Sequence, residues 1–134
     1  DQKAAEEFLY LVKAGEDTAG VRYYLGRAYY GLGKWIEAET ELKKAVELKP
    51  KWSIAHYYYG LSLYKGGRKE PAEKEFMRSL KIKPFYQGCY ALGYLYLENK
   101  EYEKARKWFV KAKELAETQE QKDKIDKIQA TIPE

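Results

Sequence analysis

The sequence predicts an all-α protein made of repeated helix pairs, and three observations support this prediction. Lysine, glutamate, leucine and alanine, which favour helices, fill the long segments of the chain. The 134 residues include only 4 prolines and 10 glycines, and several of these lie where a helix would end. The same succession of helix, turn and helix then occurs three times along the chain.

The repeat is defined by its spacing. The segment Arg22 to Pro50 aligns with His56 to Pro84 without a gap, and Gly26 and Gly60 lie 34 residues apart within it. A third copy extends from Cys89 to Glu117 and lies one residue closer to the second than the second does to the first. Several residues that share one period are the signature of a helical repeat array.

The first residues, 1–18, are predicted to be the second helix of a preceding, partial repeat. Ala4 and Phe8 have the same spacing as Ala72 and Phe76 in the second full copy. A start in the middle of a repeat leads us to expect either an unusual N-terminal cap or, as the favoured alternative, a fragment of a longer repeat array.

The first complete repeat, residues 19–52, is predicted to contain helices over residues 21–32 and 35–48. Apolar residues recur at helical spacing in both segments. Gly33 lies between them and tolerates the positive φ that helix ends prefer, and Pro50 ends the second helix.

The second repeat, residues 53–85, is expected to turn at Gly66 and Gly67. Pro71 falls in the first turn of the helix that follows, where a missing backbone N–H costs little.

In the third repeat, residues 86–118, Asn99 is expected to replace the turn glycine, since asparagine tolerates the left-handed conformation. Residues 119–134 are predicted to form a charged capping helix that covers the end of the core. Its apolar side comprises Ile125, Ile128 and Ile132.

Composition excludes several classes of protein. The 25 basic and 21 acidic residues alternate closely, which is typical of solvated helix faces, so nucleic acid is not the expected ligand. One cysteine and one histidine allow no intrachain disulfide and no structural zinc site, and no metal or other cofactor is expected. No apolar run is long enough to span a membrane, and the first residues lack the features of a signal peptide. A soluble protein is expected, with the cytoplasm favoured and the periplasm or another compartment left open.

The residues that recur at the same positions of the three copies resemble the pattern of the tetratricopeptide repeat, and this resemblance covers nearly the whole chain. The matching residues are Leu25, Gly26, Tyr29, Ala38, Leu42 and Pro50; Tyr59, Gly60, Leu63, Ala72, Phe76 and Pro84; and Leu92, Gly93, Tyr96, Ala105 and Phe109. The chain departs from the pattern where the family has tryptophan, since Arg22, His56 and Cys89 stand there, and where the third copy has Glu117 in place of proline.

The resemblance implies a right-handed α-solenoid whose first helices line a concave groove. Placed on this geometry, a stripe of mostly aromatic residues faces the groove and is predicted to bind the ligand. These residues are Tyr23, Tyr24, Arg27, Tyr30, Tyr57, Tyr58, Leu61, Tyr64, Tyr90 and Tyr94, with Leu97 continuing the stripe. Tyrosine is frequent in binding surfaces because it joins a rigid ring to one hydroxyl. The alternative interpretation is that many of these tyrosines are ordinary scaffold positions of the family.

The predicted function is a non-enzymatic scaffold that binds a peptide or partner segment. Family members that hold chaperone C-terminal carboxylates use a clamp of lysine, asparagine and arginine. This clamp is absent, since its places are taken by Tyr23, Arg27, Tyr58, Gln87 and Ala91, although Arg27 could still pair with one acidic group. An apolar or proline-rich segment is therefore the expected partner.

Two other functions stay open. The repeats could self-associate or pack against the rest of their own polypeptide, so a homo-oligomer is one alternative. An RNA-binding helical repeat is the other, supported by a group of basic residues, Lys83, Lys100, Lys104, Arg106 and Lys107.

No catalytic residue is predicted. His56 and Cys89 occupy packing positions and are expected to be buried or half-buried. The carboxylates Glu37, Glu39 and Glu41 are expected to be solvated on an outer helix.

Overall fold

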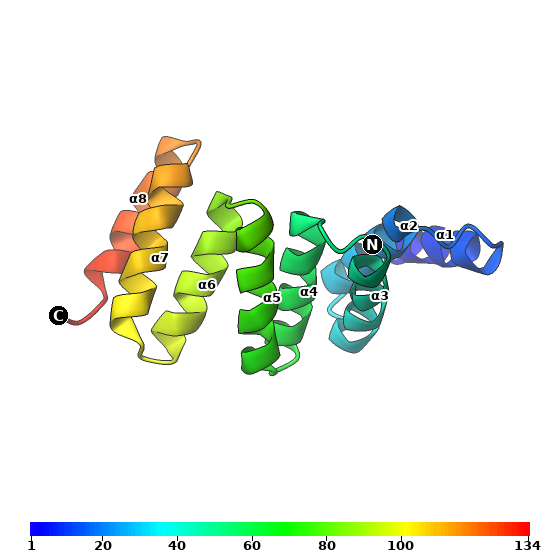
Figure 1. Cartoon of the computed structure of the whole chain (residues 1–134), viewed down its shortest axis with the longest axis horizontal. Coiled ribbons are helices and arrows are strands. Elements are labelled where there is room, and N and C mark those ends of the chain that lie inside the picture. The colour runs from blue at the N-terminus through cyan, green and yellow to red at the C-terminus, as the bar shows by residue number, and fades with distance from the viewer. The chain divides into compact units, whose positions relative to one another are not determined.

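The structure is a computed structural model that describes all residues, 1–134, and contains eight α-helices and no strand (Figure 1). The helices are α1 (Gln2–Lys13), α2 (Ala19–Gly31), α3 (Trp35–Leu48), α4 (Ser53–Lys65), α5 (Lys69–Ile82), α6 (Tyr86–Glu98), α7 (Tyr102–Leu115) and α8 (Gln119–Ala130). The predicted all-α class of helical repeats is therefore confirmed. None of these helices has the length and apolarity that a membrane-spanning helix requires.

The chain divides into two compact units, residues 1–82 and residues 83–134. The N-terminal unit contains α1 to α5, and the C-terminal unit contains α6 to α8. Within them, α2 packs on α3, α4 on α5 and α6 on α7.

Each helix pair is closed by a glycine that meets a large side chain of the second helix. A Cβ added to Gly60 would lie 2.8 Å from the ring of Phe76, and one added to Gly26 would lie 2.5 Å from Leu42. Both of these side chains are buried, with 1% of the surface of Phe76 and 0% of that of Leu42 exposed. The glycines are thus required because the helices approach too closely for any side chain at these positions.

The turns follow the predicted register with one correction. Gly33 and Gly67 have positive φ values of 75° and 85°, as expected for residues that end a helix. In the third repeat the prediction that Asn99 takes this conformation is wrong, because Asn99 has a φ of −81° and Lys100 has a φ of 60°. The position within the repeat, and not the residue type, therefore decides which residue takes the positive φ at the turn.

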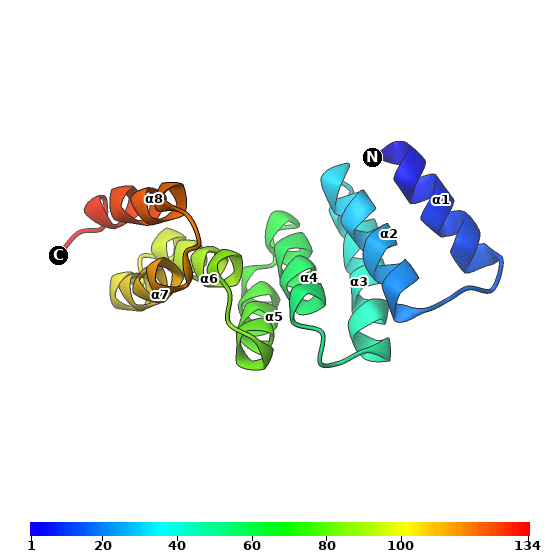
Figure 2. The same cartoon turned by 90° about the horizontal axis from the view of Figure 1, so that it is seen from above.

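In the N-terminal unit, each helix from α1 to α4 packs against the next helix along the chain. Figure 2 shows α1 beside α2, and this contact buries Ala5 against Leu25 and Ala28 with Phe8 at the margin. The next layer joins α3 to α4. Its core includes Tyr23, Ala38, Leu42, Ala45, Val46 and Ala55, with Trp52 packed against them.

In the C-terminal unit α8 packs against α7, and both views show the two helices side by side (Figures 1 and 2). Ile125 and Ile132 are buried, with 0% and 8% of their surface exposed. Lys113 donates to Asp126 at 2.7 Å across the same pair of helices. The last helix thus buries Ile125, the segment after it buries Ile132, and most of the charged residues of α8 stay exposed.

Candidate functional site

A cluster of tyrosine rings joins α2 to α4 in the N-terminal unit. Its members, called the tyrosine cluster below, are Tyr23, Tyr24, Tyr30, Tyr57 and Tyr58. Tyr58 lies at the centre, since its ring centroid is 6.1 Å from that of Tyr23, 5.8 Å from Tyr30 and 5.1 Å from Tyr57. All three contacts are edge-to-face, the geometry that aromatic quadrupoles favour.

Tyr23 is the base of this cluster. Only 3% of its surface is exposed, and its ring centroid lies 4.4 Å from that of Trp52, which precedes α4. Burial is the main reason that the pKa of Tyr23 is raised. The structure therefore places Tyr23 in the core, where it supports the other rings.

The other predicted residues of α2 and α4 reach the surface to different degrees. Tyr24 is 48% exposed and stacks on Phe8 of α1 at a centroid distance of 5.7 Å. Tyr30 is half-buried beside Trp35, and burial raises its pKa. Three residues of α4 are also half-buried, namely Tyr57, Leu61 and Tyr64.

Arg27 lies over the centre of the tyrosine cluster. Its guanidinium carbon is 4.7 Å from the centroid of the Tyr58 ring and 5.7 Å from that of Tyr23, which are distances of cation–π contact. Its Nη1 also donates to the Tyr23 hydroxyl at 3.4 Å. Arg27 itself is exposed, so the cluster presents one cation among rings at the surface.

The C-terminal unit has a shorter row of tyrosines on α6. The rings of Tyr90 and Tyr94 are stacked with centroids 6.3 Å apart, and Tyr90 also meets Phe109 of α7 edge-on at 5.8 Å. Lys124 of α8 lies 4.7 Å from the centroid of Tyr90. Tyr94 is 39% exposed and Tyr90 is half-buried, so the last helix partly covers this row.

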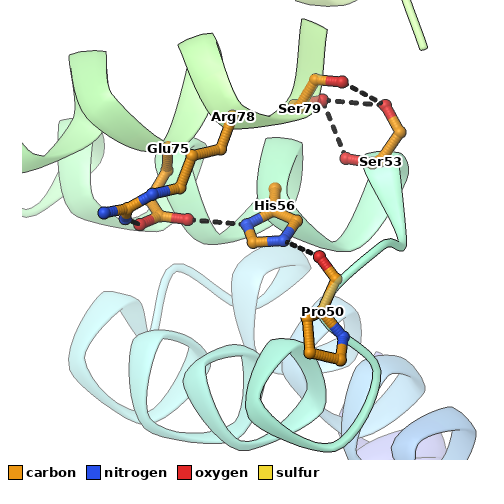
Figure 3. Close-up of polar contacts among 6 residues, drawn as sticks. All are labelled: Pro50, Ser53, His56, Glu75, Arg78 and Ser79. Atoms are coloured by element: carbon orange, nitrogen blue, oxygen red, sulfur yellow. Dashed lines mark hydrogen bonds and ion pairs between the residues drawn. The ribbon is translucent and has the colours of Figure 1, made fainter. Parts of the chain in front are cut away.

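His56 is buried in a polar network that joins α4 to α5 and to Pro50, at the end of the first repeat (Figure 3). Its Nδ1 lies 2.8 Å from Glu75 of α5, and its Nε2 lies 2.7 Å from the carbonyl oxygen of Pro50. Arg78 pairs with the other oxygen of Glu75. The expected burial of His56 is confirmed, and the hydrogen bond that its ring donates to the Glu75 carboxylate is the main reason that the pKa of His56 is raised.

Arg22 makes the corresponding network in the first repeat. It donates to Asp17 at 2.6 and 2.9 Å and to Glu41 at 2.5 Å. The expectation that Glu41 is solvated is wrong, because its side chain is only 12% exposed in this ion pair. Both His56 and Arg22 meet a glutamate 19 residues later in the chain, a spacing that was present in the sequence.

The third repeat has no such pair. Cys89 occupies the position of Arg22 and His56 and is fully buried, as expected, and burial raises its pKa to about 11. No group of three or more His, Cys, Asp or Glu side chains is arranged so that it could hold a metal ion.

Comparison with known proteins identifies the architecture. The family model described as the tetratricopeptide repeat matches residues 19–52 and 86–119. Among solved structures, "Crystal structure of MamA" has a TM-score of 0.76 at 25% identity and covers 92% of this chain and 69% of that one. "Crystal structure of YrrB: a TPR protein with an unusual peptide-binding site" has a TM-score of 0.83 at 24% identity, with coverages of 94% and 66%. The chain thus spans about two thirds of these structures, and no curated protein matches its sequence.

Proposed function

Because this chain belongs to the tetratricopeptide repeat family, whose members bind protein or peptide partners, we propose that it is a non-enzymatic scaffold that binds a peptide segment on its tyrosine-bearing helices. The observation that carries this proposal is the tyrosine cluster of α2 and α4. All its rings except that of Tyr23 reach the surface, and so does Arg27. The proposed binding residues of the N-terminal unit are Tyr24, Arg27, Tyr30, Tyr57, Tyr58, Leu61 and Tyr64. Tyr90 and Tyr94 of α6 are proposed as binding residues of the C-terminal unit by itself.

Tyr23 has a different role in this proposal. Its ring is too deeply buried to meet a ligand, but it contacts Tyr24, Tyr58 and Trp52. We assign to it the positioning of the exposed rings.

The chemistry of the surface supports a partner with apolar or proline-rich side chains. Rigid rings offer a large contact area at a low cost in side-chain entropy. A segment with apolar or proline side chains can lie on such rings without leaving many polar groups unpaired.

The test is selection of peptides from a randomised display library against the wild-type chain, followed by calorimetry. A double variant, Tyr24→Ala with Tyr58→Leu, removes two rings and keeps an apolar side chain in the half-buried site. We expect this variant to bind the selected peptides at least about tenfold more weakly, the effect of losing about 1.4 kcal/mol.

The matched control is Tyr10→Ala. Tyr10 is 71% exposed on α1 and belongs to no part of the proposed surface, so its loss should leave the affinity unchanged. Equal affinity for the wild type and the double variant, with unchanged thermal melts, would overturn the assignment of the surface. Sedimentation over a range of concentrations distinguishes self-association from peptide binding.

A further inference from the structure

Arg27 differs from every other arginine of the chain in its partners. Arg22, Arg68 and Arg78 each pair with a carboxylate, and Arg106 donates to the backbone carbonyl of Pro133. The contacts of Arg27 are with two tyrosine rings and one tyrosine hydroxyl. A guanidinium has five N–H donors, so most of those on Arg27 remain available to a ligand.

The charge around Arg27 is unbalanced because of the way acidic residues are distributed among helices. Neither α2 nor α4, which form the tyrosine cluster, contains any aspartate or glutamate. Their partner helices contain all the acidic residues of the two pairs, namely Glu37, Glu39, Glu41 and Glu47 on α3 and Glu70, Glu73 and Glu75 on α5. The two helices therefore bring no carboxylate of their own to the cluster, and Arg27, unlike Arg22 of the same helix, pairs with no carboxylate from another element.

The rings also hold Arg27 in place. The guanidinium lies on the faces of Tyr58 and Tyr23, and the bond from Nη1 to the Tyr23 hydroxyl fixes its orientation further. A planar guanidinium held in this way is suited to accept a carboxylate through two parallel hydrogen bonds, which are stronger than bonds between neutral groups. Less side-chain entropy is then lost when the ligand binds.

Aromatic residues lie on both sides of Arg27 along α2. Tyr23 and Tyr24 precede it by one turn, and Tyr30 follows it by about one turn. A ligand that places a carboxylate on Arg27 can therefore make apolar contacts before and after that group. This arrangement fits a side-chain carboxylate within a continuous segment better than the carboxylate of a chain end.

From this arrangement we infer that the occupant of the tyrosine cluster is a peptide segment with one internal aspartate or glutamate between apolar residues. The acidic side chain pairs with Arg27, and its apolar neighbours lie on Tyr24, Tyr30 and Tyr58. This inference rests on the proposed function and specifies the partner of the same surface.

The experiment uses the full chain and a peptide library displayed between constant flanking sequences, so that no randomised residue is a chain end. Selections are run in parallel on the wild type and on Arg27→Gln. We expect the wild type to enrich an aspartate or glutamate at one fixed position between apolar residues. We expect Arg27→Gln to lose that enrichment while the apolar preference stays.

Calorimetry then compares the best wild-type peptide, acetylated and amidated at its ends, with the same peptide carrying glutamine or asparagine for the acid. The wild type should bind the acidic form about tenfold more tightly, as expected for one charge-assisted pair. Arg27→Gln should bind both forms within about a factor of two, whereas Arg27→Lys, which keeps the charge without the planar fork, should keep part of the preference. Equal thermal melts establish that each variant is folded. If Arg27→Gln does not fold, the binding of the two peptides to Arg27→Lys is compared with their binding to the wild type instead.

The outcomes separate the two proposals. Peptides that bind the wild type through apolar residues alone overturn this inference and leave the proposed function standing. An acid preference that persists in Arg27→Gln also overturns the inference, because another group would then bind the carboxylate. A wild type that selects no peptide overturns both, and concentration-dependent dimers that Arg27→Gln abolishes would show that a second copy of this chain is the occupant.

Discussion

At the scale of single residues, one repeat position holds three different side chains, all of them buried. Arg22 and His56 are 8% and 7% exposed and pair with glutamates of the facing helix, whereas Cys89 is 0% exposed without an ionic partner. A buried charge is tolerated only when it is paired and hydrogen-bonded, and both pairs meet this condition. The position thus joins the two helices of a pair by ion pairing in two repeats and by packing in the third.

His56 makes the stability of the N-terminal unit depend on pH. Its two ring nitrogens face two acceptors, the Glu75 carboxylate and the Pro50 carbonyl, so only the protonated ring can donate to both. The hydrogen bond to Glu75 is the first reason that the pKa of His56 lies above its ordinary value of about 6.5. A raised pKa in the folded state adds stability that is fully present below about pH 6.5 and lost as pH rises through the folded pKa.

The expected result is a free energy of unfolding that falls as pH rises above about 6.5 and stops falling once the raised folded-state pKa of His56 has been passed. The measurement is urea unfolding of the wild type and of His56→Gln at several pH values. The chain has no other histidine, so the variant should show a much flatter dependence in this range. Parallel curves for the two proteins would contradict the assignment of the effect to His56.

Lys100 carries a conformational cost that the other two turns avoid. Its φ of 60° lies in the left-handed region, where a side chain costs roughly 1–2 kcal/mol relative to glycine. We expect Lys100→Gly to raise the free energy of unfolding of the C-terminal unit by about 1 kcal/mol. Asn99→Gly is the control, because Asn99 has an ordinary φ of −81° and should gain nothing. An equal gain in both variants would argue against relief of strain at Lys100.

At the scale of helices, the contact between the two members of a pair depends on the missing side chain of a glycine. We expect Gly60→Ala to destabilise the N-terminal unit by about 1–3 kcal/mol, because the new methyl group would force the Phe76 ring to move. Gly31→Ala is a matched control in α2, since nothing lies within 4 Å of its added Cβ. It should be neutral or stabilising by up to about 1 kcal/mol. Thermal or chemical unfolding of both variants checks the difference.

The period of the sequence was sufficient to predict the helices and their glycine contacts. Gly60 and Phe76 could be paired from spacing alone, because a repeat fixes which face each residue occupies. Spacing could not show that Trp52, from the segment before α4, would cover Tyr23, so the exposure of that ring was not predictable. The pairing of Arg22 with Glu41 was missed for a similar reason. Several glutamates alternate with lysines along α3, and the sequence alone does not show which of them lies opposite Arg22 of α2.

At the scale of the whole molecule, the two compact units should respond separately to local damage. Repeat proteins gain stability from each repeat and its nearest neighbours, so a defect in one part does not weaken distant parts equally. We expect Gly60→Ala to accelerate amide hydrogen exchange in α4 and α5 and to leave α6 to α8 unchanged. Hydrogen exchange with mass spectrometry measures this by segment. Faster exchange throughout the chain would mean that the two units unfold as one.

The position of Trp52 gives the molecule an optical reporter of its own. The indole lies 4.4 Å from Tyr23, beneath the rings that are proposed to meet the ligand, and Lys49 lies 4.6 Å from its ring. Fluorescence of tryptophan depends on the polarity and charge around the indole, and Tyr23 is close enough to transfer excitation energy to it. A ligand on the tyrosine cluster should therefore change the emission of Trp52 without any added dye. Trp35 also lies beside a ring of the cluster, 5.3 Å from Tyr30, so both indoles of the N-terminal unit can respond. Replacement of Trp108, which lies in the other unit, should leave the change intact, so a titration in a cuvette can locate the ligand on the N-terminal unit.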